Sequence, residues 1–170
     1  MTLKVFSAEY LDSLVEDASQ SPRARQHQNI HERFDDPCQH FLNAIGPDSY
    51  IRPHRHSLDP KAETLIAVRG QFALITFDEA GAITNIVRFG TEKADSALPV
   101  GADLPPGIWH TIIALVAGAI LLELKAGPFN PNAKALKDRQ RHLRTDALFL
   151  AFQGPKATID LPTPTRGTLP

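Results

Sequence analysis

The sequence predicts a mainly β protein with one core, built as an antiparallel sandwich or barrel. Between Gln39 and Lys125 it consists of short runs rich in β-branched and aromatic residues. Turn residues separate these runs, among them Gly46-Pro47-Asp48 and Pro105-Pro106-Gly107. The expected strand segments are FLNAI, SYI, TLIAV, FALITF, ITNIVRF, WHTIIAL and AILLELK. So many short strands with such frequent turns are typical of an antiparallel β fold.

Two local elements can be placed within this frame. A helix is expected at about residues 8–18, with Ser7 as its N-cap. Its apolar stripe consists of Tyr10, Leu11, Leu14, Val15 and Ala18. The connection FDEAGAI is typical of a hairpin, so strands near 71–77 and 83–89 should pair. The polar segment 21–37 shows neither helix nor strand period and is expected to be an ordered loop or arm.

We expect one domain with additions at both ends. Residues 1–36 would form the N-terminal helix and polar arm, residues 37–128 the barrel, and residues 129–170 a C-terminal extension that is no independent domain. The extension is basic and polar at first and ends in a proline-rich stretch. One or two short helices are expected around Leu136, Leu143, Leu148 and Phe152, followed by an extended tail.

Composition excludes several classes of partner. The formal charge is −1 at pH 7, from 18 basic and 19 acidic residues, so no overall field attracts nucleic acid. The longest apolar stretch is interrupted at Gly118 and is shorter than the roughly 18 residues that a membrane span needs. The N-terminal residues lack the basic and apolar regions of a secretory signal, so a cytoplasmic location is expected.

Two residues are interpreted as packing residues. Cys38 is the only cysteine, which excludes an intramolecular disulfide and suits a reducing compartment. We expect it to be a small buried apolar side chain and not a catalytic thiol. Trp109 immediately precedes His110 on an expected strand, so it points to the opposite side and packs there or at a subunit interface.

His54 and His56 are the first candidate metal ligands. Side chains two positions apart on a strand project to the same face and can converge on one ion, and Arg52 would share that face. Glu63 opens the run ETLIAVRG, and His110 follows a tight turn later in the chain. Three imidazoles and one carboxylate could therefore meet inside a barrel.

These residues resemble the two motifs of the cupin superfamily. The first motif contains Gly, His-x-His, Glu and, after six residues, Gly; the second contains Pro-x-Gly, two residues and His. The corresponding residues here are Gly46, His54, His56, Glu63, Gly70, Pro105, Gly107 and His110. The spacers before His54 and before Glu63 are longer than the family has, which leaves Asp59 as a competitor for the carboxylate position. Ala114 stands where the family usually has asparagine.

More narrowly, the chain is similar to the WbuC-type cupin-fold metalloproteins over roughly residues 22–130, in segments such as LNAIGPDSYIRPHRH and PPGIWHTIIAL. This resemblance implies a double-stranded β-helix, also called a jelly roll, whose metal is held by His54, His56, Glu63 and His110. It also implies a homodimer. Because such proteins are associated with surface-polysaccharide pathways, a sugar or sugar-nucleotide derivative is the first substrate to consider.

The polar arm carries a second set of residues that match the WbuC-type proteins, namely Arg25, Asn29 and His31. They would either fold over the mouth of the barrel and contact substrate, or belong to an arm that is solvated or exchanged with a partner subunit.

Three imidazoles and one carboxylate as ligands are typical of a catalytic metal site and not of a structural one. It leaves one position open on a tetrahedral ion and two on an octahedral one, where a water or a substrate can bind. One divalent ion is expected, either Fe, Mn or Zn, while the same donors also accept Ni or Cu.

Other residues are candidates for contacts with substrate. Arg52 would clamp a carboxylate or phosphate near the metal, or else remain a surface arginine. Glu123 and Lys125 alternate on the last expected strand and could serve as acid, base or substrate anchor. We favour the other orientation, in which Leu122 and Leu124 face the core and this pair is solvated.

The leading function hypothesis is a metal-dependent enzyme acting on a small polar or anionic substrate, either an isomerase or lyase, or an Fe(II)-dependent dioxygenase. The alternative is a non-catalytic module that senses a ligand or a metal, since Glu123 is the only recognisable general base. A metal-free sugar epimerase is a third alternative, which the match of four ligands disfavours.

Overall fold

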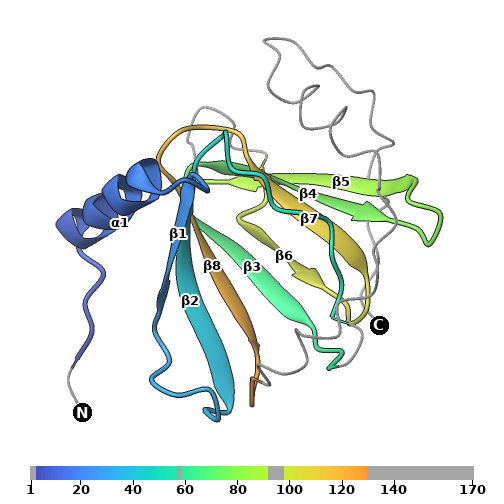
Figure 1. Cartoon of the computed structure of the whole chain (residues 1–170), viewed down its shortest axis with the longest axis horizontal. Coiled ribbons are helices and arrows are strands. Elements are labelled where there is room, and N and C mark those ends of the chain that lie inside the picture. The colour runs from blue at the N-terminus through green and yellow to red at the C-terminus, as the bar shows by residue number, and fades with distance from the viewer. Residues whose placement is uncertain (1–2, 57–58, 92–97, 130–170) are drawn as a thin grey trace.

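The computed structural model describes residues 3–56, 59–91 and 98–129. One helix is followed by eight strands, which form two β-sheets in these described residues (Figure 1). The elements are α1 (Ala8–Gln20), β1 (Arg25–Asn29), β2 (Cys38–Ile45), β3 (Glu63–Arg69), β4 (Gln71–Phe77), β5 (Ile83–Gly90), β6 (Gly101–Leu104), β7 (Trp109–Ala114) and β8 (Ala119–Ala126).

The strand order is that of a jelly roll. One sheet has the order β1-β2-β8-β3-β6 and the other the order β5-β4-β7. A short antiparallel bridge between His54 and His110 extends the second sheet beyond β7. Counting from β2, with the His54 segment as the second strand, the two sheets contain strands 1-8-3-6 and 2-7-4-5. This alternation between sheets confirms the predicted mainly β, jelly-roll fold with an N-terminal helix.

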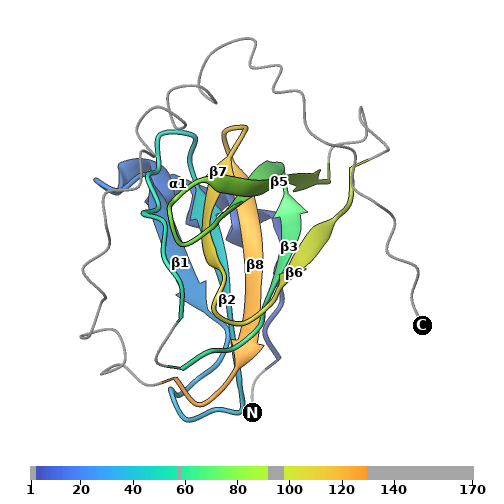
Figure 2. The ribbon, with the colours of Figure 1, turned by 90° about the vertical axis from the view of Figure 1, so that its right-hand side faces the viewer.

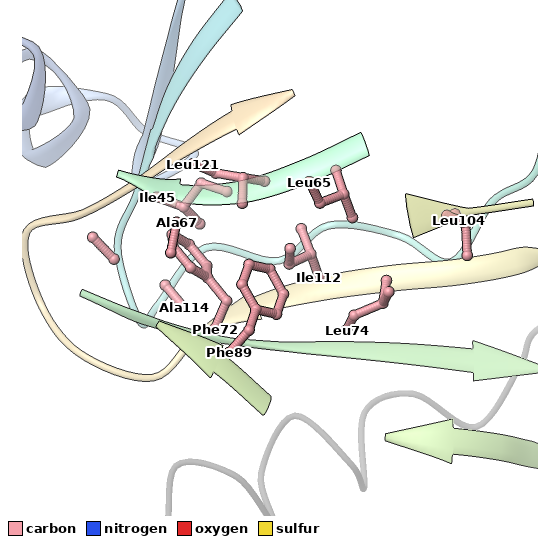
Figure 3. Close-up of a cluster of buried hydrophobic side chains, with 11 residues drawn as sticks. Ile45, Leu65, Ala67, Phe72, Leu74, Phe89, Leu104, Ile112, Ala114 and Leu121 are labelled. Carbon is pink, nitrogen blue, oxygen red and sulfur yellow. The ribbon is translucent and has the colours of Figure 1, made fainter. Parts of the chain in front are cut away.

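The two sheets cross and enclose an apolar core between their inner faces (Figures 2 and 3). The larger sheet contributes Ile45, Leu65 and Leu121, and the smaller sheet contributes Phe72 and Phe89, whose rings stack at 5.6 Å. All five side chains are at most 3% exposed. Burial of these side chains is the main force that holds the sheets together.

Helix α1 covers the outer face of the larger sheet. Ser7 caps it as predicted, accepting a hydrogen bond from the backbone N–H of Tyr10. Its buried side chains Leu14 and Ala18 pack against outward residues of β2 and β8, among them Ile120. Both faces of β8 are therefore covered, one by the core and one by the helix.

The covering helix explains why the predicted orientation of β8 was wrong. Leu122 packs on the helix side, and Leu121 packs in the core between the sheets. By alternation, Glu123 and Lys125 face the inside of the jelly roll, and Leu124 faces outward with Leu122. A strand with apolar neighbours on both faces has no polar face that could fix its orientation from sequence alone.

Two other expectations are corrected, and one strand was not predicted. The arm is not free of regular structure, because Arg25–Asn29 forms β1 and pairs with β2 along its whole length. The sequence also gave no sign of β6, a four-residue strand paired with β3. The expected strand SYI is not a strand. Edge strands such as β1 need only one row of backbone partners, so polar side chains are tolerated on them.

Cys38 is exposed, although a buried position was predicted. It is the first residue of β2 and pairs with Ala126 at the last position of β8, beyond the packed layers of the core. The helices and tail expected after residue 129 lie outside the described residues.

The predicted hairpin between β4 and β5 is confirmed, with paired residues from Gln71 opposite Gly90 to Phe77 opposite Ile83. Its turn uses Asp78, whose Oδ1 accepts from the backbone N–H groups of Ala80 and Ala82. Gly81 has φ of 86°, a left-handed conformation that favours glycine. Within the described ranges, no helix combines the length and the apolar character that crossing a bilayer demands.

The packing of α1 predicts a clear effect of truncating Leu14. This side chain is 5% exposed, so Leu14→Ala should lower the free energy of unfolding by about 2–5 kcal/mol, measured by urea denaturation. Leu3→Ala is the matched control, because Leu3 is 86% exposed and its loss should change stability by less than about 0.5 kcal/mol. Equal effects of the two variants would show that the helix does not stabilise the sheet.

Candidate metal centre

The structure brings His54, His56 and His110 together. One ring nitrogen from each lies within 4.8 Å of the others. His110 is the second residue of β7, and His54 pairs with it through two backbone hydrogen bonds of 2.9 Å. His56 follows two positions later, with its ring 5.4 Å from that of His54. Strand pairing and alternation thus aim three rings at one point.

Glu63 approaches this point from the opposite sheet. Its Oε1 lies 2.6 Å from His56 Nε2, and its Oε2 lies 3.7 Å from His110 Nε2. Lys125 Nζ is 3.4 Å from the same Oε1. The competing carboxylate, Asp59, instead forms an ion pair with Lys61 at 2.8 Å. The structure therefore places Glu63, and not Asp59, among the histidines.

Backbone carbonyls orient two of the rings. His54 Nδ1 lies 3.0 Å from the carbonyl oxygen of Arg52, and His110 Nδ1 lies 2.9 Å from that of Ile108. A carbonyl oxygen can only accept, so each Nδ1 must carry the proton of its hydrogen bond. Nε2 of each neutral ring is then left with its lone pair, as in most histidines that bind metals.

The centre favours neutral imidazoles. Burial lowers the pKa of His54 to about 4, helped by the neighbouring His110. Burial also lowers the pKa of His110, against the opposing effect of the Ile108 carbonyl and Glu63. A metal ion needs deprotonated ring nitrogens, and these two rings supply them near pH 7.

Glu63 is held as a carboxylate. Burial alone would raise its pKa, but the hydrogen bond from His56 and the charge of Lys125 outweigh burial, so the net pKa lies below the usual range. The donor set of three imidazoles and one anionic oxygen therefore fits a divalent ion.

The side chains of the centre differ in exposure. The side chains of Glu63 and His110 are 5% and 6% exposed, whereas those of His56 and Lys125 are 31% and 18% exposed. Solvent therefore reaches the cluster at His56 and Lys125 more than at Glu63 and His110.

Arg55, which separates the two histidines in sequence, fixes their segment from the other side. Its guanidinium lies over the Trp109 ring, 4.8 Å from the centroid, and forms an ion pair with Glu79. Trp109 Nε1 also donates to Glu79, at 3.4 Å. Trp109 packs with the cluster of Ile75, Phe77 and Ile113, as the packing interpretation predicted. The sequence did not reveal this contact with Glu79, which lies in the β4–β5 turn.

A second group of polar side chains lies inside the jelly roll on β2 and β8. Asn43 Nδ2 donates to Glu123 Oε1 at 3.1 Å. Burial raises the pKa of Glu123, and the negative charge of Glu63 adds to this rise, against the hydrogen bond from Asn43. Sequence reasoning missed Asn43, although a single polar residue inside the run FLNAI was a signal for an inward amide.

The side chains of the four other residues predicted to contact substrate are not part of the histidine cluster. Arg52 is exposed, and its carbonyl is the group that meets His54. Arg25 donates to Ser49 Oγ and to the Tyr50 carbonyl, and His31 Nδ1 lies 2.8 Å from the His40 carbonyl. Asn29 is paired with Phe41 in the sheet. Roles for Arg52, Arg25, Asn29 and His31 in substrate binding stay predictions.

The fold and the centre together define a jelly-roll protein with a three-histidine cluster able to hold a metal ion. Comparison with known families adds a match of residues 6–89 to a family described as a domain of unknown function (DUF6016). No curated protein matches the sequence significantly.

Several solved structures are similar. Protein SO0799 from Shewanella oneidensis has a TM-score of 0.51 at 11% identity, covering 70% of this chain and 78% of that one. KdgF from a Halomonas species has a TM-score of 0.48 at 15% identity, covering 66% and 87%. An RmlC-like cupin protein from Desulfovibrio desulfuricans has a TM-score of 0.42 at 14% identity, covering 60% and 81%. At such identities, the likeness to the Shewanella protein concerns the fold alone.

The pKa of His54 predicts how stability responds to acid in the metal-free protein. Because the folded pKa, about 4, is below the ordinary value, the unfolded chain takes up this proton first. The free energy of unfolding should therefore fall as the pH drops from about 6.5 towards 4, as measured by urea denaturation. His54→Asn should show a weaker fall, whereas His40→Asn, outside the cluster, should keep the wild-type slope. A wild-type slope in His54→Asn would contradict the assignment.

Proposed function

We propose that His54, His56, Glu63 and His110 bind one divalent metal ion and that the chain is a metal-dependent enzyme of the cupin type. The observation that carries this proposal is the pair of carbonyl-bound imidazoles, His54 and His110, which cluster with His56. His110 Nε2 lies 3.7 Å from the buried carboxylate of Glu63. The hydrogen bond to a carbonyl orients the ring and raises its basicity as a ligand.

The chemistry of the donors supports an ion that works in catalysis. When bound, it would supply Lewis acidity or, for a redox metal, activation of oxygen. Fe, Mn and Zn suit three imidazoles and a carboxylate, and Ni or Cu are accepted as well. Both an isomerase or lyase and a dioxygenase are compatible with this set.

A small polar or anionic substrate suits the more exposed side of the centre, where His56 and Lys125 lie. Lys125 lies at that side with its ammonium 3.4 Å from Glu63 Oε1 and 5.7 Å from the Phe41 ring centroid. Once a metal ion shares the negative charge of Glu63, the ammonium is available to pair with an anionic group. The resemblance to WbuC-type proteins adds a sugar or sugar-nucleotide derivative of surface-polysaccharide metabolism as the first candidate.

Glu123 favours an enzyme over a non-catalytic sensor. A carboxyl group inside the barrel, whose pKa burial raises above the ordinary value, is suited to serve as a general acid or base. A sensing module would not need such a group.

The proposal predicts the metal content of purified variants. Wild-type protein should carry close to one equivalent of metal by elemental analysis, whereas His54→Ala/His56→Ala should carry little, because two of four ligands are lost. Glu63→Gln should reduce the content less, since three imidazoles remain. His31→Ala is the matched control, because His31 is bonded to a backbone carbonyl outside the cluster and its loss should leave the metal in place.

Equal metal loading in the wild-type protein and in the double variant would reject these ligands. Thermal melting curves recorded on the same samples exclude loss of the fold as the cause of metal loss.

A further inference from the structure

Asn43 has a polar atom without a partner. Its side chain is 8% exposed, and its Oδ1 is buried without a hydrogen-bond donor among the described residues. A buried acceptor without a hydrogen bond destabilises the folded protein, so each such atom calls for an explanation. The amide is fixed from its other end, where Nδ2 donates to Glu123 Oε1.

This amide faces the same interior as the candidate metal centre. On β2, Asn43 pairs with Leu121 of β8, which packs in the core between the sheets. Glu123 lies two residues further along β8, on the same face, and Lys125 two residues beyond that. Lys125 contacts Glu63, so these side chains, spaced along one face of the sheet, form a row from the unpaired amide to the centre.

The row presents a defined set of hydrogen-bonding groups. Asn43 Oδ1 can only accept, whereas the carboxyl of Glu123, whose pKa burial raises, accepts and, when protonated, also donates. A hydroxyl group both donates and accepts, so it satisfies the two together. Lys125 adds a positive charge further along the row, which suits a carboxylate.

We propose that Asn43 and Glu123 form a hydroxyl-binding subsite beside the metal centre and that the ligand is a small hydroxycarboxylate whose carboxylate pairs with Lys125. The inference rests on the proposed function for the class of ligand, but the subsite consists of residues other than the metal ligands. Its specificity follows from the unpaired oxygen: an analogue without the hydroxyl leaves Oδ1 unsatisfied.

The test compares butyrate with 2-, 3- and 4-hydroxybutyrate, which move one hydroxyl along a constant chain. Affinities are measured by NMR titration of protein amide signals, with the Asn43 side-chain amide as the local reporter. Both Zn(II)-loaded and metal-free protein are titrated, because 2-hydroxy acids chelate metals by themselves. We expect at least one hydroxybutyrate to bind about tenfold more tightly than butyrate in both forms.

Variants separate the contributions of the row. Asn43→Leu introduces a side chain that is larger but apolar, and it should reduce the preference for the hydroxyl group to less than about twofold. If the leucine variant does not fold, Asn43→Ser is used in its place. Lys125→Met should lower the affinity for all four ligands by a similar factor and leave the preference for the hydroxyl group unchanged. Thr64→Val is the matched control, because Thr64 bonds Asp103 on the outer face of the same sheet and its loss should change neither value.

A preference that is absent from the wild-type protein, or that persists in the Asn43 variants, overturns the subsite and leaves the metal centre untouched. A preference confined to the Zn(II)-loaded form also overturns it, because chelation then explains the result. If the protein fails to bind metal but the metal-free form still prefers a hydroxybutyrate, the subsite holds and the metal-dependent function falls.

Discussion

The antiparallel bridge between His54 and His110 is the contact on which the site depends. Two backbone hydrogen bonds place these residues opposite each other, and the carbonyls of Arg52 and Ile108 then fix the rotation of both rings. An imidazole whose orientation is already fixed loses little conformational entropy when it binds a metal ion or a ligand. This is the basis of preorganisation. Arg55 holds the same segment in place on the side away from the metal centre, through its contact with the Trp109 ring.

The interior is divided into an apolar part and a polar part. Aromatic and branched side chains fill one region, including Phe72 and Phe89, while the ionisable groups occupy another. Burying a charge is costly, and the charge of Glu63 is balanced by the ammonium of Lys125 and by its contacts with His56 and His110. A concentrated group of polar side chains inside a small barrel lowers the stability of the fold, as is common at functional sites.

Sequence reasoning predicted the parts that depend on local patterns. Alternating runs and turns predicted an antiparallel sandwich or barrel and the β4–β5 hairpin. The resemblance to the cupin motifs added the jelly roll, and the spacing of those motifs identified His54, His56 and His110. It missed β1 and β6, because short or polar edge strands owe their order to a paired neighbour and not to their own side chains. It misplaced Glu123 because apolar residues cover both faces of β8, and it missed Asn43 because an unpaired amide becomes visible only when strand registers are known.

Strand β8 serves two layers at once, and this restricts how the protein can diverge. Its odd-numbered residues from Leu121 onward point into the barrel, and its even-numbered residues contact or face the helix layer. Insertion or deletion of one residue within 119–125 would exchange the two sets and turn the carboxyl of Glu123 towards α1. Homologous chains can therefore vary this strand by substitution, whereas changes of length must fall in the turn 115–118 or after Ala126.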